Sequence, residues 1–78
     1  MIKKQLRLVI TFSTTTEAMA MEQMCKELGL DGRLIPVPKT ITAGCGLAWS
    51  AKPESADELT QQMKDHLIQP EGLYECLV

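Results

Sequence analysis

The sequence predicts one α+β domain in which two helices cover a single face of a four-stranded antiparallel sheet, in the order βαββαβ. Three observations favour this class. Four short segments have the alternation or aliphatic content of strands, two have the spacing of amphipathic helices, and turn or capping residues separate them. The 78 residues allow one domain with one modest core, which we place over residues 1–78.

The first strand is expected over residues 5–12, where side chains alternate between two faces. Leu6, Leu8, Ile10 and Phe12 share one face, and Arg7, Val9 and Thr11 share the other. A helix to about Leu28 follows, because Thr14 and Glu17 fit a capping box. Its apolar stripe consists of Ala18, Met21, Cys25 and Leu28. Gly29 is expected to end this helix in a left-handed conformation.

The remaining strands are expected over residues 33–37, 46–51 and 73–78. Pro36 has no backbone N–H to donate, so the second strand belongs at an edge of the sheet. The loop between the second and third strands is rich in proline, threonine and glycine.

The second helix is expected to begin at another capping box, formed by Ser55 and Glu58. Its apolar stripe consists of Ala56, Leu59, Met63 and Leu67. Pro70 and Gly72 are expected to end it. The resulting order is the ferredoxin-like arrangement of two split βαβ units.

The face of the sheet that carries no helix predicts a protein interface. Val9, Ile35 and Val37 are expected on it, with either Trp49 or Tyr74. An exposed apolar patch usually marks an interaction surface, so a homodimer stacked on this face is a candidate assembly.

Composition and charge exclude several classes of protein. Eight basic residues against ten acidic ones give a net charge of −2, which provides no basic field for nucleic acid. The three aromatic residues are too few for a base-stacking platform. The longest aliphatic run, residues 8–10, is far too short to span a membrane, and a cytoplasmic location is expected. No cofactor is expected.

The βαββαβ topology brings two segments to one end of the sheet. The first and second strands run parallel, so both end where the first helix begins. Residues 13–15 and the loop over residues 38–46 should therefore be neighbours. The turn over residues 70–72 arrives at the same end.

Cys45 is the candidate reactive residue of that loop. Gly44 and Gly46 flank it without bulk and offer backbone amides to an anion. A thiol reacts as its thiolate, and the positive end of the first helix at Thr14 and the cation of Lys39 are expected to favour that form. The alternative interpretation is a purely structural turn that happens to contain cysteine, since free cysteine is often buried and inert.

The other cysteines and the histidine favour structural interpretations. Cys25 lies on the apolar stripe of a helix, and Cys76 alternates with neighbours in a strand. An odd cysteine count argues against a disulfide framework. His66 is expected on a solvated helix face, and no metal-ligand spacing accompanies it, so no metal site is expected.

Three stretches of the chain resemble a small bacterial family of Se/S carrier protein-like domains. They are Phe12-Ser13-Thr14-Thr15 with Ala18-Met19, Arg33-Leu34-Ile35-Pro36-Val37-Pro38, and Thr42-Ala43-Gly44-Cys45-Gly46-Leu47-Ala48. The resemblance covers residues 8–74. It implies that Cys45 carries the sulfur or selenium. It also implies that the partners are cysteine desulfurases or other sulfur- and selenium-relay proteins.

Three functions therefore remain open. The first is a carrier, rather than a true enzyme, that accepts a persulfide or its selenium equivalent on Cys45 and passes it to an acceptor protein. The second is a non-catalytic small-molecule-binding or oligomerisation module of the same fold. The third is a redox-sensing thiol that is oxidised to sulfenic acid. No second cysteine lies nearby in the sequence to resolve it, and the spatial position of Cys76 is left open.

Overall fold

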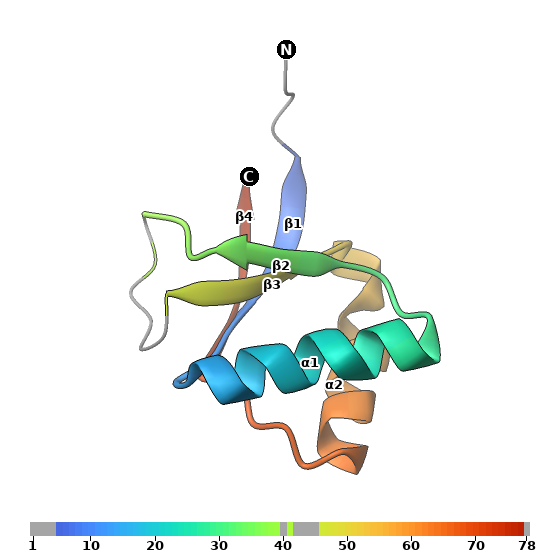
Figure 1. Cartoon of the computed structure of the whole chain (residues 1–78). Coiled ribbons are helices and arrows are strands. Elements are labelled where there is room, and N and C mark those ends of the chain that lie inside the picture. The colour runs from blue at the N-terminus through green and yellow to red at the C-terminus, as the bar shows by residue number, and fades with distance from the viewer. Residues whose placement is uncertain (1–4, 40, 42–45, 78) are drawn as a thin grey trace.

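The computed structural model describes residues 5–39, 41 and 46–77. Its elements are β1 (Leu6–Thr11), α1 (Thr15–Leu28), β2 (Arg33–Pro36), β3 (Leu47–Ala51), a 3₁₀ turn η1 (Pro53–Ser55), α2 (Ala56–Asp65) and β4 (Gly72–Leu77). The four strands form one antiparallel sheet in the order β2-β3-β1-β4, and both helices lie on one side of it (Figure 1). The ferredoxin-like βαββαβ prediction is confirmed.

Strand β1 is the centre of the core because it pairs with β3 on one side and β4 on the other. Its alternating pattern is confirmed: Leu8, Ile10 and Phe12 all pack into the cluster between sheet and helices. Met21 of α1 and Met63 of α2 belong to the same cluster, so these two helices share one core.

Helix α1 begins at the predicted Thr14 cap and ends at the predicted Gly29, although Glu17 bonds to hydroxyls and not to the backbone N–H of Thr14 as a full capping box requires. The hydroxyl of Thr14 accepts the backbone N–H of Glu17, and Gly29 takes a φ of 68° at the other end. The backbone N–H of Leu30 then donates to the carbonyl of Cys25, which closes the last turn. The buried stripe of α1 is Ala18, Met21, Met24 and Cys25. The prediction that Leu28 belongs to it is wrong, since Leu28 is half-exposed.

Helix α2 differs from the prediction at both of its ends. Ser55 makes no side-chain capping hydrogen bond, because η1 already leads the chain into the helix. The helix ends at Asp65, well before Pro70. Leu67 was expected in the stripe, but it is 89% exposed, and Ile68 enters the core in its place.

The end of α2 explains this exchange. The N–H of Ile68 donates to the carbonyl of Met63 at 2.8 Å, and the N–H of Leu67 donates to Lys64 at 3.2 Å. This is the hydrogen-bond pattern of a Schellman motif, whose turning residue must be left-handed. Leu67 has a φ of 58°, so leucine occupies a position that usually favours glycine.

The central residues on the helix-free face of the sheet are less exposed than expected. Val9, Thr11 and Ala48 are completely buried there, and Ser50 is nearly so. Tyr74 pairs with Val9 and lies on this face. The expectation that Trp49 could also lie there is wrong. Its ring belongs to the core under the helices.

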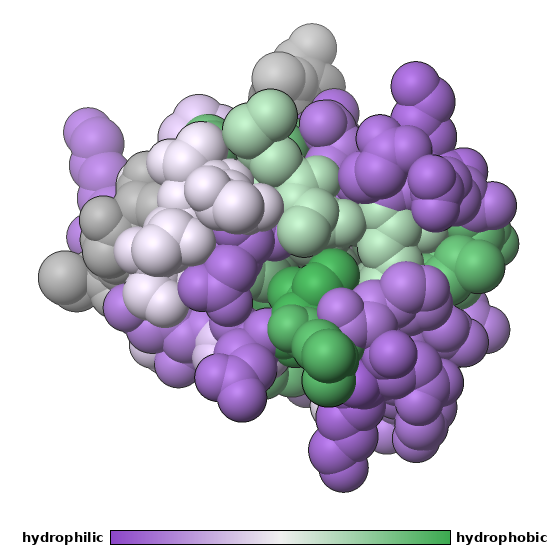
Figure 2. Space-filling view, turned by 60° about the horizontal axis from the view of Figure 1, so that its bottom comes forward, coloured by the Kyte–Doolittle hydropathy of each residue, from purple (hydrophilic) through white to green (hydrophobic). Residues whose placement is uncertain are grey.

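The helical side of the molecule combines polar and apolar surface. Figure 2 shows a band of apolar side chains running between polar flanks on this side. Two large apolar residues exposed on α1 are Met19 and Leu28, and Leu67 follows α2. Among the described helices, none is long and apolar enough to cross a membrane.

Candidate functional site

One end of the sheet gathers the segments that the topology predicts. The backbone N–H of Glu71 donates to the carbonyl of Thr11 at 2.7 Å, which joins the start of β4 to the end of β1. The hydroxyl of Thr11 also donates to the carbonyl of Gly72 at 3.4 Å. The neighbouring strand β3 begins at Leu47, so the β2–β3 loop leaves from this same end.

The base of the β2–β3 loop is held by the backbone. The N–H of Val37 donates to the carbonyl of Gly46 at 3.0 Å, one register step beyond the last β2–β3 pair. A turn follows, in which the N–H of Ile41 donates to the carbonyl of Pro38 at 2.9 Å. The two sides of the loop therefore leave the sheet from a fixed anchor.

Gly46 and Lys39 stand on either side of this loop. Gly46 is exposed with a φ of 75°, a left-handed conformation that favours glycine, and a Cβ atom there would meet no neighbour within 4 Å. Lys39 is exposed. Gly44 and Cys45 lie outside the described residues, so their predicted roles stay predictions.

The start of α1 holds the carboxylate of Glu17 against two hydroxyl groups. Thr14 accepts the N–H of Glu17 at 3.2 Å, as a helix cap should. The carboxylate of Glu17 in turn accepts from the hydroxyls of Thr14 at 3.3 Å and Ser13 at 3.4 Å. This carboxylate therefore opposes the positive end of the helix dipole at the place where an anion was expected to benefit from it.

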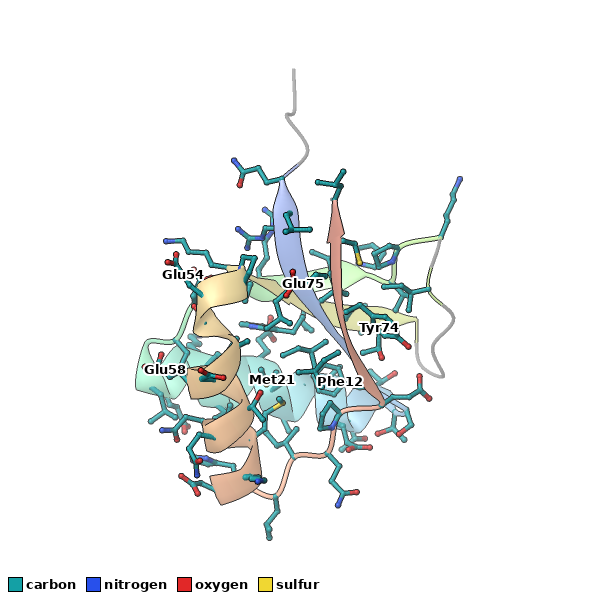
Figure 3. The ribbon with its side chains drawn as sticks, turned by 180° about the vertical axis from the view of Figure 1, so that it is seen from behind. Phe12, Met21, Glu54, Glu58, Tyr74 and Glu75 are labelled. Atoms are coloured by element: carbon teal, nitrogen blue, oxygen red, sulfur yellow. The ribbon has the colours of Figure 1, made fainter. Side chains whose placement is uncertain are left out.

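Tyr74 is a residue of this end of the sheet that sequence reasoning did not assign to the site. A Cβ atom added to Gly72 would lie 2.9 Å from the Oη atom of Tyr74, so the ring lies over that glycine. Figure 3 shows Tyr74 on the side of β4 away from Glu75, as strand alternation requires. The sequence contained one indication of this contact, because Gly72 and Tyr74 are two residues apart and so face the same side of a strand.

The two described cysteines differ in how far their thiols are buried. Cys25 is only 2% exposed, and burial, with a smaller contribution from the charge of Asp31, raises the pKa of its thiol from 9.0 to about 11. It is a core residue, as predicted. Cys76 is half-buried on the helix-free face and lies opposite Arg7.

His66 follows α2, as expected for a solvated residue. Its side chain is exposed, and its Nδ1 atom lies 2.9 Å from the carbonyl oxygen of Gln62. Within the described part of the chain, no group of three or more His, Cys, Asp or Glu side chains is arranged to hold a metal ion.

The fold and this loop define a small ferredoxin-like domain whose strand β3 is preceded by a cysteine between two glycines. Comparison with known proteins assigns it further. The chain belongs to the family described as "Putative Se/S carrier protein-like", whose model matches residues 7–75 and so includes the entire β2–β3 loop.

One curated relative carries the same kind of name. The chain is 38% identical over 68 residues to a "Putative sulfur carrier protein" of Aquifex aeolicus (strain VF5), which covers 85% of this chain. The match spans only 34% of that relative, so this chain corresponds to about a third of its length. No solved structure is significantly similar.

Proposed function

We propose that this chain accepts a sulfur or selenium atom on Cys45 and passes it to an acceptor protein. Family membership over residues 7–75 is the observation that carries this proposal. The burial of Cys25 supports it, because a thiol with a pKa of about 11 provides almost no thiolate near neutral pH. Cys45 and the half-buried Cys76 are the remaining thiols, and the resemblance of the loop residues to the family favours Cys45.

The transfer needs a nucleophile and a good leaving group. The Cys45 thiolate attacks the outer sulfur of a cysteine persulfide on a donor protein such as a cysteine desulfurase. A new S–S bond forms on Cys45, the S–S bond of the donor breaks, and the donor cysteine leaves as a thiolate with the bonding electron pair. No external oxidant or reductant is required, and a second attack by an acceptor thiolate releases the atom.

The described part of the loop suits a reaction between two protein surfaces. Gly46 is exposed, and the space around its Cα atom is open, so a partner's backbone can approach closely. Lys39 provides an exposed cation on the other side of the loop, which favours an anionic sulfur nearby. The Val37–Gly46 hydrogen bond fixes where the loop leaves the sheet.

Mass spectrometry of the intact chain tests the proposal directly. The chain is incubated with a cysteine desulfurase and cysteine, without reductant, and then digested for site assignment. We expect an adduct of one sulfur atom on Cys45, and with selenocysteine as substrate an adduct of one selenium atom. The Cys45→Ser variant should show neither.

Cys76→Ser is the matched control, since it removes a half-buried thiol and should keep the adduct. An unmodified Cys45, beside an established sulfur acceptor that becomes modified in the same mixture, would contradict the proposal. If Cys45 is also alkylated no faster than a model peptide near neutral pH, the non-catalytic binding module is favoured.

A further inference from the structure

The two edges of the sheet differ in how they are protected. An unpaired edge strand exposes backbone N–H and C=O groups that can pair with another strand. Edge strand β2 has only four residues, begins with Arg33 and ends with Pro36. Its brevity, charge and missing N–H make it a poor template for further pairing.

Edge strand β4 has none of these protections. It has six residues, with neither proline nor lysine, and Glu75 is its one charged side chain. Its register with β1 runs without interruption from Gly72 to Leu77, so no bulge twists the strand away. No other described segment pairs with its outer edge.

The side chains of β4 are also more exposed and more apolar than those of a shielded strand. Leu77 is 63% exposed, Leu73 is 44% exposed and Tyr74 is 41% exposed. Leu6, which pairs directly with Leu77, is 49% exposed. Backbone and side chains together make β4 the surface of the described chain best suited to accept an extended partner strand.

We propose that β4 pairs antiparallel with β4 of a second copy of this chain, which joins two sheets edge to edge. A two-fold axis perpendicular to the sheet brings the same strand of each copy together in opposite directions. Under this symmetry, β4 residues that face the helices in one copy pair with β4 residues that face the helices in the other. Because faces alternate along a strand, the two residue numbers of each pair are both odd or both even.

Charge selects the register within this symmetric pairing. A ladder centred on Glu75 would place two carboxylates directly opposite each other, which is unfavourable. A ladder centred on Tyr74 instead pairs the two tyrosines, sets Leu73 opposite Glu75 of the partner, and sets Gly72 opposite Cys76. A ladder centred on Cys76 would also keep the charges apart but would pair only residues 75–77 of the strand. The Tyr74-centred register pairs residues 72–76 and is the one we assign.

Sedimentation equilibrium of the 78-residue chain over a range of concentrations provides the first test. We expect a reversible species of twice the 8.7 kDa monomer mass. An edge-to-edge interface is small, so the association should be weak, with a dissociation constant on the order of micromolar or above. A chain that remains monomeric at the highest soluble concentration overturns the proposal.

Two opposite charges at Leu73 provide the second test. Leu73→Glu places a carboxylate opposite the partner's Glu75 twice in the dimer, and should weaken association about tenfold. Leu73→Lys places an ammonium group there and should leave association unchanged or stronger. Leu67→Glu, at a more exposed leucine outside any strand, should have no effect.

Circular dichroism melting of each variant confirms that it is folded before its mass is interpreted. If Leu73→Glu stays dimeric, β4 is not the interface. If Leu73→Glu and Leu73→Lys both dissociate the dimer, the Tyr74-centred register is wrong. This test requires no desulfurase, so its outcome is independent of sulfur transfer.

Discussion

Thr14 and Glu17 bond to each other twice at the start of α1. The Thr14 hydroxyl accepts the N–H of Glu17 at 3.2 Å, and the Glu17 carboxylate accepts from that hydroxyl at 3.3 Å. The first bond stabilises the helix, whereas the carboxylate brings a negative charge to the end of the sheet from which the Cys45 loop departs. The stabilising bond uses the backbone N–H of Glu17, so its carboxylate can be removed while this cap stays in place.

The Thr14→Ala variant tests the cap. It leaves the N–H of Glu17 without its side-chain acceptor, and should lower the free energy of unfolding by about 1 kcal/mol. Urea denaturation followed by circular dichroism measures this. Thr16→Ala is the control, because Thr16 lies two residues later and is also exposed, and it should change stability much less. Equal losses in the two variants would show that the cap contributes nothing specific.

The Glu17→Gln variant tests the charge. Removing the carboxylate should lower the pKa of the Cys45 thiol and speed its alkylation by about two- to threefold, the scale of a screened surface interaction. A pH–rate profile of iodoacetamide alkylation in low salt measures the shift. Glu27→Gln, near the other end of α1, should leave the profile unchanged. A profile insensitive to Glu17 would place that carboxylate outside the field of the thiol.

Gly32 should tolerate no side chain. Its φ is 122°, and a Cβ atom would collide with Nε1 of Trp49 and approach the carbonyl oxygen of Ser50 to 2.7 Å. That indole nitrogen donates to the carbonyl of Asp31 at 3.1 Å, so the ring cannot retreat without losing a bond. We expect Gly32→Ala to cost about 3 kcal/mol or more in thermal or urea unfolding.

Gly29→Ala is the matched control for Gly32→Ala. Gly29 also has a left-handed φ, of 68°, but a Cβ atom there has open space around it. Its replacement should cost only about 1 kcal/mol, the strain of the backbone alone. Similar losses at both glycines would argue against a steric role for Trp49.

Cys25 should make stability depend on pH in the alkaline range. Its folded pKa of about 11 lies above the ordinary 9.0, so the folded state holds the thiol proton more tightly than the unfolded state. The resulting stabilisation is fully present below pH 9 and is lost as pH rises through 11. It amounts to roughly 2–3 kcal/mol.

Urea denaturation of the chain and of Cys25→Ala at pH 8 and above isolates this contribution. The variant lacks the thiol, so its stability should fall less steeply with pH than that of the parent, while tyrosine and lysine titrate in both. Parallel curves for the two proteins would contradict the assignment of a raised pKa to Cys25.

Leu67→Gly should stabilise the chain. Leucine at a φ of 58° is strained, and its side chain is 89% exposed and buries little apolar surface. Glycine removes that strain at the expense of a more flexible unfolded chain, for a net gain of about 0.5–1 kcal/mol. A higher midpoint of urea unfolding is the expected reading, and a lower midpoint would show that Leu67 makes contacts that matter.

Local patterns in the sequence predicted most of the fold correctly. The structure confirms four local signals: the alternation in β1, the cap at Thr14, the left-handed Gly29 and the edge position of Pro36. The end of α2 was missed because Leu67 continues a perfect helical spacing. The choice between Leu67 and Ile68 depends on how the chain turns toward β4, which no spacing encodes.

The sequence predicted which segments meet at the site but not how their side chains lie. Topology correctly joined the end of β1 to the base of the β2–β3 loop, because strand direction follows from element order. Coordinates were needed to place the Tyr74 ring over Gly72 and to show that the Glu17 carboxylate bonds to neighbouring hydroxyls. Both depend on rotamers and hydrogen bonds that residue types alone leave open.

The strand order β2-β3-β1-β4 has a consequence for how many partners can be engaged at once. The loop joins β2 and β3, whereas β4 lies two strand spacings from β3 and three from β2, roughly 10 to 14 Å across the sheet. The proposed transfer site and the proposed pairing strand therefore lie toward opposite edges of the sheet. Two chains paired through β4 would carry their loops at opposite ends of one sheet, a bivalent particle able to bind two subunits of an oligomeric donor with the gain in avidity that linkage brings.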